Sequence, residues 1–279
     1  MQLEFTKMHG AGNDVIVFDA PGDGRLPTVE EWRALADRHK GIGFDQAMVI
    51  EPPRRAGTQA YYRIFNADGG EVEQCGNGVR CVAAFLLRRG EVKNGEALLD
   101  SPAGLIRVRI HDESLVSVDM GTPNFDPKSL PFEASAEAHV YPLQVAGTDV
   151  EIGAVSMGNP HAVLTVSSVA SAPVDRLGPA IEKHARFARR VNVGFMEIVD
   201  RTHIRLRVFE RGTGETLACG TGACAAVAVG RRHGRLDETV EVELPGGKLE
   251  ITWKGPGEHI WMKGPAAVSF TGQVEIQGS

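Results

Sequence analysis

The sequence predicts an α+β protein built from two similar halves. One segment occurs twice, because residues 65–90 align with residues 209–234. Each copy contains an Ala- and Val-rich run with almost no charge, which is typical of a buried helix. Short runs of alternating polar and apolar residues follow each copy and indicate strands. A length of 279 residues also favours two domains over one.

The repeat is specific enough to align residue by residue. The identical pairs are Phe65/Phe209, Gly70/Gly214, Glu71/Glu215, Cys75/Cys219, Gly76/Gly220, Gly78/Gly222, Ala84/Ala228, Arg88/Arg232 and Gly90/Gly234. The similarity extends upstream, where Gly12-Asn13 matches Gly158-Asn159, and downstream, where 102–104 matches 245–247. We interpret the chain as a diverged duplication.

The elements of each half follow from local signals. Each Gly-Asn pair leads into an apolar strand, at 15–17 and at 162–164. Thr28 and Glu31 form a capping box that predicts a helix start, with a counterpart near Asp175. A central buried helix follows each Cys-Gly-x-Gly and should end at Gly90 or Gly234. The alternating runs 105–110 and 115–120, and 248–253 and 259–263, predict hairpins. Each half therefore has several strands and about two helices.

Composition points to a small-molecule partner in a reducing compartment. The formal net charge of -6 disfavours nucleic acid or a membrane surface as partner. The N-terminal residues lack a signal peptide, and no window reaches the roughly 20 apolar residues of a membrane span, so we expect a cytoplasmic protein. The four cysteines fit free thiols there, and their spacing differs from that of common zinc sites, so we expect no metal.

The two Cys-Gly-x-Gly segments, 75–78 and 219–222, lie where the buried helices begin. Free backbone N–H groups and the helix dipole at such an end attract an anion, so a substrate carboxylate could bind both helix starts. The same field stabilises a thiolate, whereas burial opposes it. If the two halves face each other, Cys75 and Cys219 lie on opposite sides of a ligand. One thiolate and one thiol in that arrangement could invert an amino-acid α-carbon.

Simpler interpretations of these residues remain open. A single Cys at a helix start is more often a small buried side chain than an acid or base, but two at matched positions reverse that preference. Cys81 and Cys224 fall at non-matching positions and are assigned to packing. The Gly-x-Gly elements could be turns, but no phosphate-binding or dinucleotide-binding glycine motif is present.

The segments 66–81 and 210–224 resemble the two signature motifs of the diaminopimelate epimerase family. Segments 8–14, 37–46, 157–161 and 190–193 support the resemblance, which covers essentially the whole chain. It implies two pseudo-symmetric domains, each a β-sheet wrapped around a central buried helix, with the active site in the cleft between them. We expect one domain at 1–119 plus 265–279 and the other at 120–264. It also implies conversion of LL-2,6-diaminopimelate to the meso isomer, needed for lysine and peptidoglycan, with no cofactor or metal.

The resemblance also implies roles for individual residues. Cys75 and Cys219 become the acid/base pair, and Gly76, Asn77, Gly220 and Thr221 hold the carboxylate at the reacting carbon. The remaining substrate groups are assigned to Asn13, Gln46, Asn66, Asn159, Asn192, Glu210 and Arg211. Arg211 suits a carboxylate and Glu210 an ammonium. His161 and Glu210 would tune the pKa of the thiols, and Phe270 occupies the place of an aromatic residue, often Tyr, at the homodimer interface.

Without the resemblance, Asn13, Asn66, Asn159 and Asn192 are more often turn residues. His161 is equally well a hydrogen-bonded structural histidine. Two other functions are compatible with a pair of cysteines. Proline and hydroxyproline racemases also use two cysteines, but typically have His where this chain has Asn77, and the polar shell suits a longer substrate charged at both ends. A non-catalytic module that senses oxidation through Cys75 and Cys219 is the alternative outside enzymes.

Overall fold

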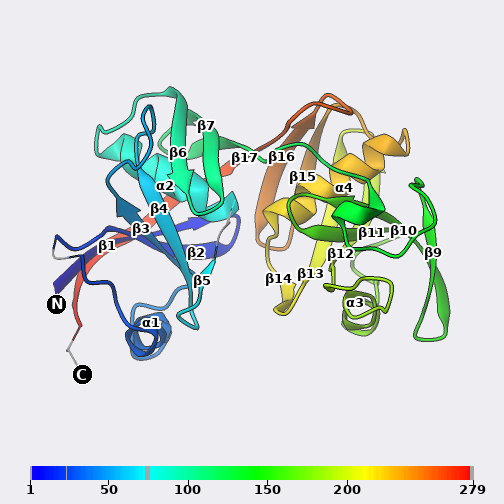
Figure 1. Ribbon diagram of the computed structural model, residues 1–279, viewed down its shortest axis with the longest axis horizontal. Coiled ribbons are helices and arrows are strands. Elements are labelled where there is room, and N and C mark those ends of the chain that lie inside the picture. The colour runs from blue at the N-terminus through cyan, green and yellow to red at the C-terminus, as the bar shows by residue number, and fades with distance from the viewer. Residues whose placement is uncertain (1, 23, 73–75, 277–279) are drawn as a thin grey trace. The chain divides into compact units, whose positions relative to one another are not determined.

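The structure, a computed structural model, describes residues 2–22, 24–72 and 76–276. The chain divides into two compact units, unit 1 (Met1–Val118 with Lys263–Ser279) and unit 2 (Asp119–Met262). The ribbon of each unit combines strands with two helices (Figure 1). The fold is therefore mixed α+β, with four α-helices among the described residues.

In unit 1 each of the two helices lies between groups of two or three strands along the chain. Its helices are α1 (Val29–Ala36) and α2 (Gly76–Arg88). Its strands are β1 (Gln2–Gly10), β2 (Asn13–Asp19), β3 (Gln46–Glu51), β4 (Tyr61–Asn66), β5 (Glu71–Val72), β6 (Gly95–Ser101), β7 (Gly104–Asp112), β8 (Leu115–Asp119) and β18 (Ala267–Glu275). β8 ends where the chain passes into unit 2, and β17 (Ile260–Pro265) lies where it returns.

Unit 2 likewise combines strands with two α-helices. Its helices are α3 (Val174–Glu182), α4 (Gly220–Arg232) and the short 3-10 turn η1 (Pro127–Ser129). Its strands are β9 (Tyr141–Val145), β10 (Thr148–Ser156), β11 (Pro160–Val166), β12 (Asn192–Asp200), β13 (His203–Glu210), β14 (Gly214–Thr216), β15 (Thr239–Leu244) and β16 (Gly247–Trp253).

The strand pairing repeats between the units, which confirms the duplication at the level of topology. In unit 1, β2 pairs parallel with β3, β3 antiparallel with β4, and β4 parallel with β6. In unit 2, β11, β12, β13 and β15 pair in the same order and with the same directions. The outer pairs β1–β2 and β10–β11 are antiparallel in both, as are the hairpins β6–β7 and β15–β16.

The helices α2 and α4 form the buried centre of their units. Both begin immediately after the repeated cysteine, and most of their residues are buried. α2 contacts β1, β2, β3 and β7, and α4 contacts β10 to β13 and β16. Small side chains allow this close approach: a Cβ at Gly153 on β10 would lie 2.4 Å from Val229 Cγ1 on α4. The predicted glycine stops are confirmed, since Gly90 and Gly234 adopt φ of 73° and 70°.

The other two helices also begin where the sequence predicts. Glu31 N donates to Thr28 Oγ1 at 3.3 Å and Thr28 N to Glu31 Oε2 at 2.7 Å, which is the predicted capping box. α1 buries Trp32, which stacks on Phe65 with ring centroids 5.0 Å apart. The counterpart expected near Asp175 is α3, which begins at Val174.

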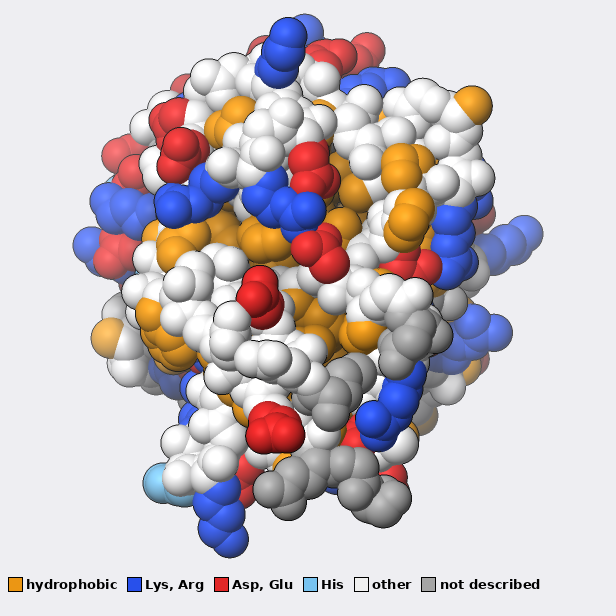
Figure 2. Space-filling model, turned by 90° about the vertical axis from the view of Figure 1, so that its left-hand side faces the viewer, with side chains coloured by type: hydrophobic (Ala, Val, Ile, Leu, Met, Phe, Trp, Pro, Cys, Tyr) orange, Lys and Arg blue, Asp and Glu red, His pale blue; other side chains and the backbone are white. Residues whose placement is uncertain are grey.

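No helix in the described ranges is long and apolar enough to span a membrane. On the face of the molecule drawn in Figure 2, blue Lys and Arg side chains alternate with red Asp and Glu side chains around exposed hydrophobic groups. That face carries charges of both signs side by side, in keeping with the modest net charge of the chain.

Candidate active site

Strand direction brings three predicted site residues to one edge in each unit. Asn13 begins β2, Gln46 begins the parallel strand β3, and Asn66 ends β4, which runs antiparallel to β3. Two parallel starts and one antiparallel end share an edge, so the three side chains emerge together. Asn159, Asn192 and Glu210 occupy the same places around β11, β12 and β13.

In unit 2 a chain of hydrogen bonds connects His161, Asn159 and Thr221 to the thiol of Cys219. The ring nitrogen Nε2 of His161 lies 2.9 Å from Asn159 Oδ1. Asn159 Nδ2 donates to Thr221 Oγ1 at 3.4 Å, and Thr221 Oγ1 lies 3.6 Å from Cys219 Sγ. Because the Asn159 oxygen can only accept, His161 donates from Nε2, whereas either Thr221 Oγ1 or Cys219 Sγ can be the donor in the contact between them.

Cys219 is the N-cap of α4, and its side chain is buried. Burial and the carboxylate of Glu210 raise its pKa well above the ordinary value, while hydrogen bonds from Thr221 and the backbone N–H of Gly222 act in the opposite direction. A Cβ at Gly222 would lie 3.2 Å from Cys219 Sγ and 3.0 Å from Val208 Cγ2, so glycine is what lets the helix N–H approach the sulfur. In this state Cys219 is a protonated thiol near neutral pH, able to donate a proton.

His161 is neutral at any physiological pH. Its side chain is buried, and burial followed by the positive charge of Arg211 lowers its pKa to about 3. The predicted influence of His161 on the thiol therefore has to act through Asn159 and Thr221 rather than through a charge on the imidazole.

Glu210 is the last residue of β13, and Arg211 is the first residue of the turn that follows. Glu210 Oε1 accepts a hydrogen bond from Thr216 Oγ1 at 2.6 Å. Asn192 is anchored at both ends of its amide, since Nδ2 donates to Pro160 O at 3.0 Å and Oδ1 accepts from Arg211 N at 3.0 Å. The exposed guanidinium of Arg211 donates to Arg189 O at 3.1 Å.

Sequence reasoning missed Glu182, which holds this turn. It is the last residue of α3 and is 3% exposed. Its Oε1 accepts from Gly212 N at 2.8 Å, and its backbone oxygen accepts from Val191 N at 3.2 Å. One residue thus ties the segment before Asn192 to the segment after Arg211. A buried acid at the end of an amphipathic helix was the only signal, and it did not indicate a partner.

In the described part of unit 1, two side-chain oxygens at the shared edge lack a partner. Gln46 Nε2 donates to Asn66 Oδ1 at 2.9 Å. Gln46 Oε1 and Asn13 Oδ1 are both buried and have no hydrogen-bond partner among the residues that the structure describes. Buried acceptors without donors are rare in proteins, so these two oxygens are available to the N–H groups of a ligand.

The first turn of α2 contains Gly76 and Asn77, and Cys75 lies outside the described residues. Asn77 is buried and accepts from Arg80 Nη2 at 2.9 Å. Arg80, which sequence reasoning also missed, is fully buried and donates from Nε to Pro265 O at 3.1 Å. The guanidinium thus connects the helix start to the returning C-terminal segment.

Phe270, another residue singled out in the sequence, lies on a strand away from these edges. Phe270 on β18 is half exposed, and its ring meets that of Phe5 edge-on at 6.0 Å. Among the described residues there is no group of three or more His, Cys, Asp or Glu that could hold a metal ion. In unit 2, then, the structure brings together Cys219, Thr221, Asn159, His161, Asn192 and Glu210.

Comparison with known proteins gives one family. The family model described as "Diaminopimelate epimerase" matches residues 5–125 and 153–269. The chain is 55% identical to a diaminopimelate epimerase of Alkalilimnicola ehrlichii, over 99% of this chain and 100% of that one. It is 50% identical to one of Stutzerimonas stutzeri, with the same coverage. A solved hydroxyproline epimerase from Agrobacterium vitis shares the fold, with a TM-score of 0.67 and 17% identity over 98% of this chain and 92% of that one.

Proposed function

Since this chain belongs to the diaminopimelate epimerase family, we propose that it inverts one α-carbon of diaminopimelate with two thiols, Cys75 and Cys219, and without a cofactor. The chain is an isomerase with diaminopimelate epimerase activity, which implies a role in lysine biosynthesis. The direction we propose is from the LL to the meso isomer, which also supplies peptidoglycan. The observation that carries the mechanism is the buried Cys219 thiol, with Glu210 opposing its ionisation and Thr221 and Gly222 favouring it.

In the proposed reaction the substrate lies between the starts of α2 and α4, in a cleft between two sheet-wrapped helices. The thiolate of one cysteine removes the α-proton from one face, and the thiol of the other donates a proton to the opposite face. The carbanion between these steps is neutralised by the second proton, so each turnover exchanges the protonation states of the two sulfurs. The matched positions of Cys75 and Cys219 in the repeat support this assignment.

The α-proton of an amino acid is very weakly acidic, so the carboxylate must be stabilised as negative charge develops on it. Helix dipoles contribute roughly 0.3–2 kcal/mol each, which is too little alone. We assign the backbone donors at Gly76, Asn77, Gly220 and Thr221 to this carboxylate. Preorganised donors aimed at a developing oxyanion are usually the largest single contribution to such catalysis.

The other substrate groups are assigned by chemistry. The unpaired oxygens of Asn13 and Gln46 would accept N–H bonds from an ammonium group, which satisfies them. Glu210 would bind an ammonium and Arg211 a carboxylate, with Asn66, Asn159 and Asn192 completing the hydrogen bonds. His161 would act on the Cys219 pKa by orienting Asn159 and hence Thr221.

Turnover in heavy water tests this function. LL-diaminopimelate incubated with the protein in D₂O is expected to yield the meso isomer with one deuterium at the inverted carbon only, by chiral separation and mass spectrometry. Proline, the substrate of the rival activity, is expected to remain unconverted. Faster turnover of proline than of diaminopimelate, or inversion without solvent deuterium, would contradict the proposal.

Replacing Thr221 tests the hydrogen-bond chain to the thiol. Thr221→Val removes the hydroxyl donor that lowers the pKa of Cys219, so that pKa rises. Whether Cys219 serves as base or acid, the limb of the pH–rate profile that it controls moves to higher pH. Thr221→Ser keeps the donor and is the matched control. A valine variant with an unmoved profile would exclude this role of Thr221.

We also propose a cytoplasmic homodimer, with Phe270 in the contact between subunits. The half-exposed ring on β18 supports the contact, although it lacks the hydroxyl of the tyrosine often found there. Sedimentation of Phe270→Asp should show monomer if this face joins the subunits, whereas a dimer would point to another face.

A further inference from the structure

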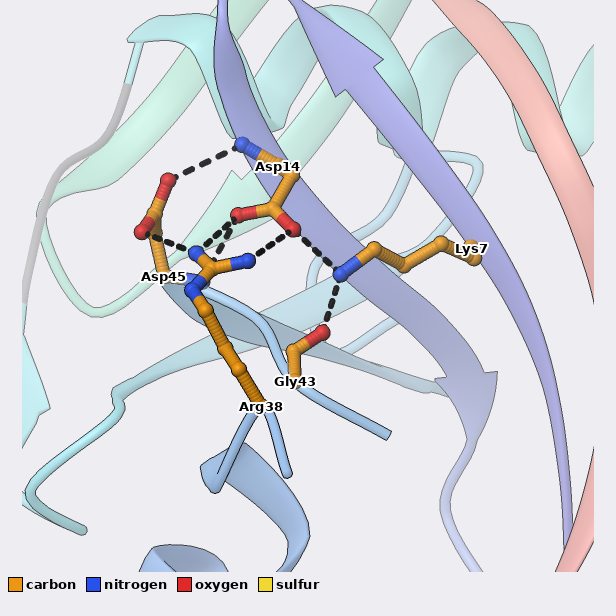
Figure 3. A network of polar contacts seen from close by, with 5 residues as sticks. All are labelled: Lys7, Asp14, Arg38, Gly43 and Asp45. Atoms are coloured by element: carbon orange, nitrogen blue, oxygen red, sulfur yellow. Dashed lines mark hydrogen bonds and ion pairs between the residues drawn. The ribbon is translucent and has the colours of Figure 1, made fainter. Parts of the chain in front are cut away.

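Four charged side chains of unit 1, Lys7, Asp14, Arg38 and Asp45, form a network of polar contacts (Figure 3). Asp14 on β2 accepts from Arg38 Nη1 at 3.0 Å and Nη2 at 2.8 Å, a fork-shaped pair. Arg38 Nη2 also donates to Asp45 Oδ1 at 2.8 Å. Lys7 Nζ, on β1, binds both Asp14 Oδ2 and the backbone oxygen of Gly43. Two positive and two negative groups make the network neutral.

The network lies next to both open acceptors in the sequence. Asp14 follows Asn13, and Asp45 precedes Gln46. Asp45 N donates to Asp14 O at 2.9 Å, and Asp14 N donates to Asp45 Oδ2 at 3.1 Å, so the two aspartates also pair through their backbones. Any shift of Asp14 relative to Asp45 therefore shifts Asn13 relative to Gln46.

The segment before Gln46 is held in place by these side-chain contacts, because it has no regular secondary structure of its own. Residues 37–45, between α1 and β3, contain no helix or strand, and Gly43 has φ of 71°. Lys7 holds Gly43 and Arg38 holds Asp45, both against Asp14. Burial raises the pKa of Asp14, but the hydrogen bonds from Arg38 and Lys7 outweigh it and hold that pKa well below its usual range. Asp14 is therefore charged at the centre of the network.

In unit 2 the corresponding amide side chain is held by different contacts. The residue matching Asp14 is Pro160, which has no charge to offer. There, Asn192 uses both amide atoms for its own anchoring, to Pro160 O and Arg211 N. In unit 1 the oxygens of Asn13 and Gln46 make no such bond. They stay open for a ligand, and their position depends on the neighbouring residues.

We propose that Arg38, together with Asp14 and Asp45, is a positioning residue that sets Asn13 Oδ1 and Gln46 Oε1 in the geometry that receives a substrate N–H group. This inference rests on the proposed function. Nothing in it requires Arg38 to touch the substrate. The guanidinium acts through the two aspartates that flank the acceptors.

The test compares Arg38→Met with the control substitution Arg109→Met, which removes an arginine from an ion pair elsewhere in unit 1. The Arg38 side chain is 56% exposed, so its loss leaves no buried cavity. Arg38→Met is expected to raise KM for diaminopimelate about tenfold while kcat changes less than about threefold, because it loosens binding groups rather than the thiols. Arg38→Lys, which keeps the charge but not the fork, is expected to recover part of the loss. Arg109→Met removes an exposed arginine that pairs with Glu96 across β6 and β7 and should leave both constants unchanged.

A double-mutant cycle distinguishes positioning from a general loss of stability. If Arg38 acts through Gln46, Arg38→Met adds little to the KM of Gln46→Ala, whereas an unrelated effect multiplies with it. Wild-type KM in Arg38→Met, a change in kcat alone, or multiplicative effects in the cycle would each overturn the inference. If Arg38→Met fails to fold, Asp45→Asn, which removes one charge of the network, is judged by the same criteria. Failure of the wild-type protein to convert diaminopimelate would instead refute the proposed function.

Discussion

Replacement of Cys219 by alanine is expected to abolish inversion of diaminopimelate. The substitution removes the sulfur at the start of α4, while α4 itself retains its buried apolar face. Loss of a positioned acid or base costs typically about 10²–10⁴-fold in rate. In the proposed mechanism each thiol acts on one face only, so inversion should fall to background. Chiral separation of the LL and meso isomers measures it.

A sharper signature comes from isotope exchange. With Cys219 absent, the thiolate of Cys75 could still remove the α-proton of the one epimer whose hydrogen faces it, and the resulting thiol could return a proton to the same face. Deuterium should then enter one epimer without inversion, and Cys75→Ala should show the opposite preference. The pair of variants would also establish which cysteine deprotonates which epimer. Equal exchange of both epimers in either variant would contradict opposed thiols.

Cys224→Ala is the matched control for this experiment. Cys224 lies in the same helix, is fully buried, and occupies a position with no counterpart cysteine in the repeat. Removing one buried sulfur atom at a packing position is a small change, and activity is expected to stay within about twofold of wild type. Loss of inversion in this variant as well would mean that alanine substitutions in α4 disturb the fold.

The second large effect is expected from Glu210→Gln. The Glu210 carboxylate raises the pKa of Cys219, after burial the next cause in size. A neutral amide of the same shape removes that charge, so the thiolate becomes easier to form and the pKa falls. The limb of the pH–rate profile controlled by Cys219 should therefore move to lower pH, opposite to Thr221→Val. Loss of the proposed charge-assisted bond to an ammonium group, worth roughly 1.5–3 kcal/mol, should raise KM about tenfold or more.

Glu215→Gln provides the control for the lost carboxylate. Glu215 lies on β14 in the same hairpin and pairs with Arg207, with Nε at 2.6 Å and Nη2 at 2.9 Å from its oxygens. Its removal changes the net charge equally and should leave the profile in place. A profile that moves with Glu215→Gln, or fails to move with Glu210→Gln, would remove Glu210 from its assigned role.

Much of the fold could be predicted because its signals are local. The Thr28 capping box, the glycines that end α2 and α4, and the uncharged helix interiors each involve residues a few positions apart. The duplication extended these signals, since each element found in one half had a counterpart in the other. The family was likewise predicted from its motifs, and the comparisons confirm it.

The site could be predicted only as a set of residues, with no contacts between them. Asn159 and Thr221 are far apart in the sequence, and their hydrogen bond exists because the start of β11 lies beside the start of α4. Glu182, Arg80 and Arg38 carry no motif that indicates what they hold, and all three act on backbone or side chains from distant segments. His161 remained ambiguous in the sequence, and its burial is what shows it to be neutral.

By itself, therefore, the sequence determined the repeat, the central helices and the family, because these depend on local patterns and on motifs, and it led to the proposal for the two cysteines. The tertiary structure alone decided how Cys219 is tuned, which oxygens stay unpaired, and which charges support them. Those properties depend on strand register and on burial, which set distances and local polarity between residues that no sequence spacing relates.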